Sequence, residues 1–266
     1  MKNNTTLLLC AFLLLFQNIL LAFSPYESFL QSGKPRQVGL LAIVEEEKMA
    51  SFKETLEAIH TGNCRDHLAD AGITNLSAYS REIGGQTWIV LHFTLAGNVD
   101  YLDAAQLFES ATPGTKALSG LIKSPERAAR FQTRWLQMEW INYIRGKEVA
   151  HPAKSRLMIV TTILPEKEEE YRTLHQTVWP GVVDQVARSN SRDLCIFLAD
   201  IDDLLVEFLY VEYVGTDQKA DDDMSQTDAI NHRWWKLTDA CQKGLPGVDG
   251  NWTLMEPVIA EDKTDE

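Results

Sequence analysis

The feature that most constrains this chain of 266 residues is an internal repeat spaced by nearly half its length. Three pairs of segments match in the same order, at separations of 119, 118 and 117 residues. The paired segments are Phe52–Leu56 with Tyr171–His175, Asn75–Tyr79 with Asp193–Phe197, and Trp135–Glu139 with Trp252–Glu256. Segments that keep their order and drift slowly in spacing are typical of a diverged tandem duplication. We therefore predict two copies, residues 36–147 and 154–262, joined by a short linker.

Both predicted copies begin with the same two elements. Val38–Val44 and Leu157–Leu164 are apolar and rich in β-branched residues, which predicts a strand at the start of each copy. Lys48–Ala69 and Lys167–Ala187 show helical apolar spacing. Pro180 lies inside the second of these helices, and we expect it to kink the helix or to restart it at a first-turn position.

Hairpins follow in both copies. They are predicted over residues 77–95, closed by a tight turn at Gly84-Gly85, and over residues 194–214. The second copy ends with a helix over about 228–241, preceded by the capping-box pattern Ser225-x-x-Asp228, and a strand over 253–259.

The order β-α-β-β-α-β is the ferredoxin-like plait, in which helices cover only one face of the sheet. A tandem copy can cover the other face. We therefore expect an α+β fold in which two fused ferredoxin-like halves form an intramolecular dimeric α+β barrel, so that a single chain would take the place of a homodimer.

The N-terminal segment differs in composition from both copies. Lys2 is the only charged residue in positions 1–24, and Leu7–Phe23 is apolar apart from Gln17 and Asn18. This pattern is typical of a secretory signal peptide. The alternative is an uncleaved membrane anchor, for which the apolar stretch is slightly short. We expect residues 1–24 to direct export to the periplasm or the cell exterior.

Charge and cysteine content disfavour several classes of partner and cofactor. Lys and Arg total 25 against 38 Asp and Glu, which gives a formal net charge of −13. Nucleic acids and anionic membrane surfaces attract cationic proteins, so we expect neither as a partner of the mature chain. Cys64, Cys195 and Cys241 follow the signal segment. Their number is odd and none is paired in Cys-x-x-Cys spacing, so at least one is unpaired within the chain and a zinc site is not expected.

Aromatic and ionisable residues gather in the second copy. Tyr171 and His175 are one helical turn apart, and Trp179 follows one turn later on the same side. Trp234 and Trp235 are adjacent on the later helix, so one can line a cavity while the other packs in the core. Flat indole rings beside an acid/base group could form a carbohydrate pocket. Taken singly, the same residues also fit an ordinary amphipathic helix and core.

At these residues the second copy resembles the L-rhamnose mutarotase family. The matching segments are Tyr171-Arg-Thr-Leu-His175 followed by Trp179-Pro180, Arg233–Cys241, and Leu254-Met-Glu256. The resemblance implies a dimeric α+β barrel that interconverts the anomers of L-rhamnose without metal or cofactor. It also implies that His175 is the acid/base residue and Tyr171 its partner. Trp234 and Trp235 would then face the sugar, and we add Trp179 to this binding set.

The chain departs from the family pattern at the start of the second strand of this copy. The family usually carries Asn-Tyr there, whereas this chain has Asp193-Leu194 and lacks the tyrosine hydroxyl. The first copy has Phe52 and Leu56 in place of the tyrosine and histidine, so we expect no site in it.

The sequence thus predicts a monosaccharide anomer isomerase acting on L-rhamnose or a similar aldose. One alternative is a non-catalytic sugar-binding or sensing module of the same fold. Another is a barrel that acts on a different small molecule, such as a haem-degrading or monooxygenase relative.

Overall fold

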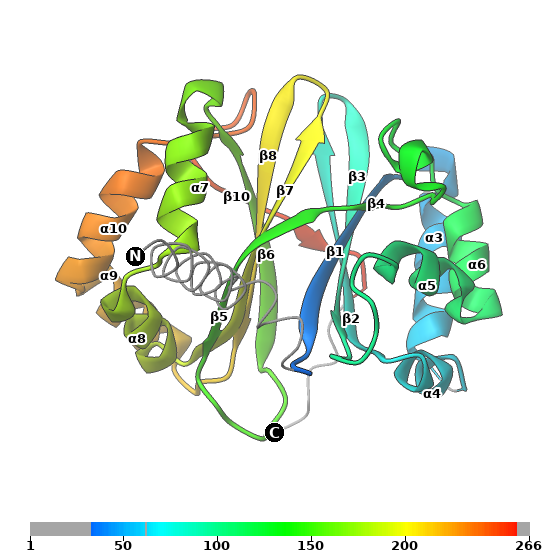
Figure 1. The fold of residues 1–266 in the computed structure, drawn as a ribbon, viewed down its shortest axis with the longest axis horizontal. Helices are drawn as coiled ribbons and strands as arrows, with labels where there is room; N and C mark the ends of the chain where they lie inside the picture. The colour runs from blue at the N-terminus through cyan, green and yellow to red at the C-terminus, as the bar shows by residue number, and fades with distance from the viewer. Residues whose placement is uncertain (1–32, 62, 260–266) are drawn as a thin grey trace, which may run out of the picture.

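A computed structural model describes residues 33–61 and 63–259 of the chain. The predicted signal segment and the last three residues of the predicted second copy lie outside the described residues, so export stays a prediction. Two antiparallel sheets stand face to face at the centre, and helices cover their outer faces (Figure 1). Within the described part of the chain, no helix is long and apolar enough to cross a membrane.

The first half builds one sheet and the helices beside it. Its strands are β1 (Arg36–Ile43), β2 (Ile73–Ile83), β3 (Gln86–Leu95) and β4 (Leu136–Gln137). Its helices are α3 (Met49–His60), α4 (Asn63–Asp70), α5 (Ala104–Ala111) and α6 (Pro113–Gly120). Every residue of β1 is buried, because Leu40 and Ala42 face the helices while Leu41 and Ile43 face the other sheet. A strand covered on both faces has a nearly continuous apolar sequence.

The second half repeats this arrangement. Its strands are β6 (Ser155–Ile163), β7 (Ser191–Ile201), β8 (Leu204–Tyr213), β9 (Gln242–Lys243) and β10 (Thr253–Leu254). Its helices are α7 (Glu168–Gln176), α8 (Pro180–Arg188), α9 (Gln218–Thr227) and α10 (Ala229–Asp239). With β5 (Glu139–Gly146) and β11 (Glu256–Pro257) included, the sheet orders are β11-β2-β3-β1-β4 and β10-β6-β8-β7-β5. In each sheet the four strands of one half follow the ferredoxin-like order, which confirms the predicted fold class.

The chain passes from one sheet to the other at two points. β5 (Glu139–Gly146) follows β4 directly along the chain but pairs with β7 at the edge of the second sheet. β11 (Glu256–Pro257) follows β10 but pairs with β2 at the edge of the first sheet. Figure 1 shows β4 and β5 as one run that crosses from the first sheet to the second. Each half therefore completes the sheet of the other.

The space between the sheets is an apolar core. Leu41, Tyr79 and Val90 of the first sheet pack there with Phe197 and Phe208 of the second. Burying apolar surface contributes about 25 cal/mol per Å² to stability, so this contact couples the two halves.

Several predicted elements differ in detail. The helix predicted over 48–69 is divided into α3 and α4, and the helix predicted over 167–187 is divided into α7 and α8. Pro180 restarts the helix in the second case, as the first residue of α8. Proline suits that position because the first helical N–H needs no intrahelical partner. The strand predicted over 253–259 is divided between β10 and β11, because the chain changes sheets at Met255. In the first half, α5 and α6 occupy the place of the second helix of the ferredoxin-like order, whose bounds in this copy were not predicted.

The predicted capping box is wrong. Ser225 lies inside α9, where its hydroxyl donates to the Asp221 carbonyl oxygen at 2.9 Å. Asp228 alone caps α10, because its carboxylate accepts hydrogen bonds from the Ile230 and Asn231 backbone N–H groups at 2.8 and 3.0 Å. The Gly84-Gly85 turn is confirmed, and both glycines have positive φ, 60° and 73°.

Candidate active site

The predicted acid/base residues lie on the buried face of α7. Three glutamates fill the first turn of this helix, where negative charge suits the helix dipole. Tyr171 and His175 turn toward the second sheet, and their exposed fractions are 1% and 5%. Tyr171 packs with Ile163, Leu198 and Cys241 between α7 and the sheet. The helix thus carries both predicted residues into the layer between helices and strands.

The hydrogen bonds of His175 indicate its tautomer. Nδ1 lies 3.0 Å from the backbone carbonyl oxygen of Tyr171, which can only accept, so we assign the proton to Nδ1. Nε2 makes no hydrogen bond to any described residue and keeps its lone pair. Asn142 Nδ2 donates to the His175 carbonyl oxygen at 2.8 Å and ties α7 to β5. Burial lowers the pKa of His175 to about 4, so the imidazole is neutral at pH 7.

Two aromatic side chains contact the His175 ring, and a third packs against one of them. The Tyr171 ring lies 4.2 Å from the imidazole, measured between ring centroids. Trp234 of α10 meets the imidazole edge-on at 5.5 Å, and Trp179 meets Trp234 at the same distance. Trp235 instead packs against exposed His232 at 5.6 Å. The structure therefore brings together four of the five predicted site residues, and Trp235 points elsewhere.

A row of apolar side chains lies on the helix-facing side of the second sheet, near the end of α7. Ile159, Leu209 and Ile196 are register neighbours on β6, β8 and β7, and the first two are only half-buried. Asn142, which donates to the His175 backbone carbonyl, pairs with Ile196 and so ties the end of α7 to this row. An incompletely covered apolar floor with an imidazole and two indole rings beside it suits the C–H face of a sugar.

Asp193 and Leu194, where the chain differs from the family pattern, point to opposite faces of the sheet. Asp193 sits in a β-bulge with a φ of 49°, and its carboxylate accepts a hydrogen bond from Tyr143 Oη at 2.6 Å. Cys195 points between the sheets, so by alternation the half-buried Leu194 faces the helices. The missing tyrosine hydroxyl therefore belongs to the face that carries His175.

Sequence reasoning missed Glu207, which lies on β8 next to Tyr171. Its side chain is fully buried, and Oε2 accepts a hydrogen bond from Gln242 Nε2 at 2.9 Å. Burial raises the pKa of Glu207 to about 7, although Tyr171 and Gln242 oppose the shift. Burial, and then the Glu207 charge, raise the pKa of Tyr171 well above its usual value. The alternation of β8 could have revealed Glu207, because it occupies a helix-facing position between Leu205 and Leu209.

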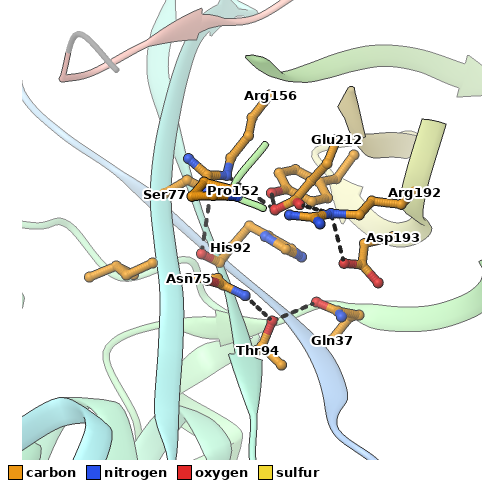
Figure 2. A network of polar contacts seen from close by, with 12 residues as sticks. Gln37, Asn75, Ser77, His92, Thr94, Pro152, Arg156, Arg192, Asp193 and Glu212 are labelled. Atoms are coloured by element: carbon orange, nitrogen blue, oxygen red, sulfur yellow. Dashed lines mark hydrogen bonds and ion pairs between the residues drawn. The ribbon is translucent and has the colours of Figure 1, made fainter. Parts of the chain in front are cut away.

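A second polar region lies at one end of the space between the sheets. Figure 2 shows Glu212 with the guanidinium groups of Arg156 and Arg192, at 3.1 and 2.7 Å from its carboxylate. A cavity of about 990 Å³ opens nearby and is lined by both halves, with Gln37 and Asp193 among its residues. Tyr171, His175 and the three predicted tryptophans do not line it, so it is separate from the His175 cluster.

Residues that could hold a metal are not gathered in the described structure. Between residues 33 and 259, leaving out residue 62, no three His, Cys, Asp or Glu side chains converge. Cys64, Cys195 and Cys241 are free thiols.

The site coincides with the segment that matches known proteins. A family model described as L-rhamnose mutarotase matches residues 156–260. The L-rhamnose mutarotase of Burkholderia ambifaria is 34% identical over 92 residues, which are 34% of this chain and 84% of the relative. This chain belongs to the L-rhamnose mutarotase family. The predicted family resemblance is therefore confirmed, and the family match covers the half that carries His175.

A second relative and a solved structure are also similar to this chain. The L-rhamnose mutarotase of Oceanobacillus iheyensis is 28% identical over 78 residues, which are 29% of this chain and 70% of the relative. A candidate monooxygenase of Fusobacterium nucleatum aligns with a TM-score of 0.49 and 13% identity, over 85% of this chain and 93% of that chain.

Proposed function

We propose that this chain is a cofactor-free monosaccharide mutarotase that acts on L-rhamnose or a similar aldose. The observation that carries the proposal is the state of His175. Its Nδ1 is held by the Tyr171 carbonyl, its Nε2 is unengaged, and Trp234 lies beside it. The names of the relatives support the sugar substrate, and the half-buried apolar row near the end of α7 supports a binding surface for it.

The proposed reaction opens and recloses the sugar ring. A base removes the proton of the anomeric hydroxyl, an acid protonates the ring oxygen, and the C1–O bond breaks to leave the open aldehyde. Rotation about C1–C2 followed by the reverse steps gives the other anomer. His175 Nε2 accepts the first proton. Because burial lowers the pKa of His175, the imidazolium formed is a strong acid and readily returns a proton to the sugar.

The other residues hold this proton carrier and the sugar. Tyr171 fixes the imidazole through its backbone carbonyl and its ring, while Trp179 and Trp234 form an apolar wall. The proton returns to the sugar at the end of each cycle, so the reaction is balanced without a co-reactant.

The test is anomer exchange measured by saturation-transfer NMR on L-rhamnose and several other aldoses. We expect His175→Ala to lose about 10²–10⁴ of the rate enhancement, the usual contribution of one acid/base group. The matched control is His151→Ala, because His151 is exposed on the linker between the halves. Full enhancement in His175→Ala would contradict the proposal.

A second candidate is a sugar-binding module that has lost turnover. Leu194 favours it, because this residue faces the site at the position where the family usually carries a tyrosine. Saturable sugar binding without faster exchange in the parent chain would support this candidate over the first.

A further inference from the structure

Glu207 is a fully buried carboxylate among mostly apolar and neutral polar side chains on the helix-facing side of the second sheet. It lies on β8 between its register neighbours Thr161 of β6 and Leu198 of β7. Its relative exposure is 0%, and Tyr171 of α7 lies beside it. A buried carboxylate costs several kcal/mol unless its surroundings compensate. Such a group therefore needs either compensating partners or a function.

The compensation at Glu207 is incomplete. Gln242 donates to Oε2, but Oε1 is buried without a hydrogen-bond partner among the described residues. The Tyr171 hydroxyl is also buried without one, and the Glu207 charge acts directly on it. A donor and an acceptor thus lie next to each other, both shielded from water, and each affects the pKa of the other.

Among the ionisable groups of this cluster, Glu207 is the one that titrates near neutral pH. From α7 comes Tyr171, whose pKa is raised by burial and by the Glu207 charge. His175 lies one turn further along α7, and burial lowers its pKa to about 4. Next to β9 lies Cys241, whose thiol pKa burial raises. Gln242 has no charge, and in the described part of the chain no Lys or Arg pairs with Glu207. Glu207, with its pKa near 7, is the group in this cluster whose charge changes between pH 6 and 8.

We propose that Glu207 is a positioning residue for anomer exchange: its carboxylate accepts a hydrogen bond from the Tyr171 hydroxyl and so holds the turn of α7 that carries His175. This inference rests on the proposed mutarotase function. When Glu207 takes up a proton from solvent, it becomes neutral and its acceptor strength falls. Activity then depends on the charge of a residue that does not touch the sugar.

The distinguishing experiment is the pH profile of saturation-transfer anomer exchange between pH 5.5 and 8.5, with uncatalysed exchange subtracted. For the parent chain we expect activity to rise with pH through a step near 7. Glu207→Gln keeps the shape of the side chain but cannot ionise, so we expect the step to vanish. We also expect the plateau rate to fall about 10-fold, the usual effect of losing one charge-assisted hydrogen bond.

Two further variants keep the test sharp. Glu169→Gln makes the same change at an exposed glutamate of α7, the helix that carries Tyr171, and should leave the profile unchanged. Glu207→Asp keeps an ionisable group with a shorter reach, so it should keep a step at reduced rate, which a purely structural role would not produce. Thermal melting of each variant identifies loss of folding.

The outcomes separate the two proposals. If the parent is active and Glu207→Gln keeps its step near pH 7, the role of Glu207 is overturned and the mutarotase proposal stands. If the folded parent accelerates exchange of no sugar, the proposed function is overturned and the role of Glu207 with it.

Discussion

At the scale of single residues, the most informative group outside the site is His92. It lies between the two sheets, is 1% exposed, and stacks on Tyr210 with ring centroids 3.6 Å apart. Neither ring nitrogen has a hydrogen-bond partner among the described residues. Burial lowers the pKa of His92 to about 3, against about 6.5 in an unfolded chain. Between these values the unfolded state binds more protons, so His92 destabilises the fold as the pH falls below 6.5.

Replacing His92 should therefore change how stability depends on pH. We expect His92→Phe to relieve part of the acid sensitivity, at about 1.4 kcal/mol per pH unit below 6.5. Urea unfolding at pH 7 and pH 5 measures this, with exposed His151→Phe as the control. Identical pH dependence in His92→Phe and the parent would show that His92 does not titrate as its burial implies.

At the scale of elements, the start of α10 depends on the side chain of Asp228. This helix carries Trp234, and Asp228 caps it through two backbone N–H groups and an ion pair with Arg188 at 3.0 Å. We expect Asp228→Ala to lower the free energy of unfolding by about 1 kcal/mol, as for other N-cap deletions. Urea unfolding of Asp228→Ala, Asp228→Asn and exposed Asp222→Ala tests this. The asparagine should retain most of the stability, and a loss in Asp222→Ala as large as in Asp228→Ala would refute the capping role.

At the scale of the whole molecule, the two halves should unfold together. β5 and β11 each complete the sheet of the opposite half, and the core between the sheets contains residues of both. Phe208 is fully buried in this core. We expect Phe208→Ala to lower stability by about 3–5 kcal/mol while keeping a single transition. Coincident urea curves from circular dichroism and tryptophan fluorescence would support this, and two separated transitions would show that the halves fold independently.

The features that the sequence predicted depend on spacing along the chain. The repeat near 118 residues, the apolar character of β1 and β6, and the turn of helix between Tyr171 and His175 are all properties of short or periodic segments. They were sufficient for the fold class and for four residues that the structure brings together. The capping box failed because a local pattern at Ser225 cannot reveal that a separate helix, α9, occupies those residues.

Only the tertiary structure decided which distant residues meet. The sequence determined the duplication, the element order and the His175 motif, because repeats and side-chain periodicity are properties of the order of residues along the chain. It did not place Glu207 beside Tyr171 and Gln242, since that contact requires α7, β8 and β9 to pack at one point. Nor did it show that β5 and β11 change sheets or that Trp235 turns away from His175. Each of these contacts depends on which strands and helices pack together in the folded chain. That packing is driven by the burial of apolar surface.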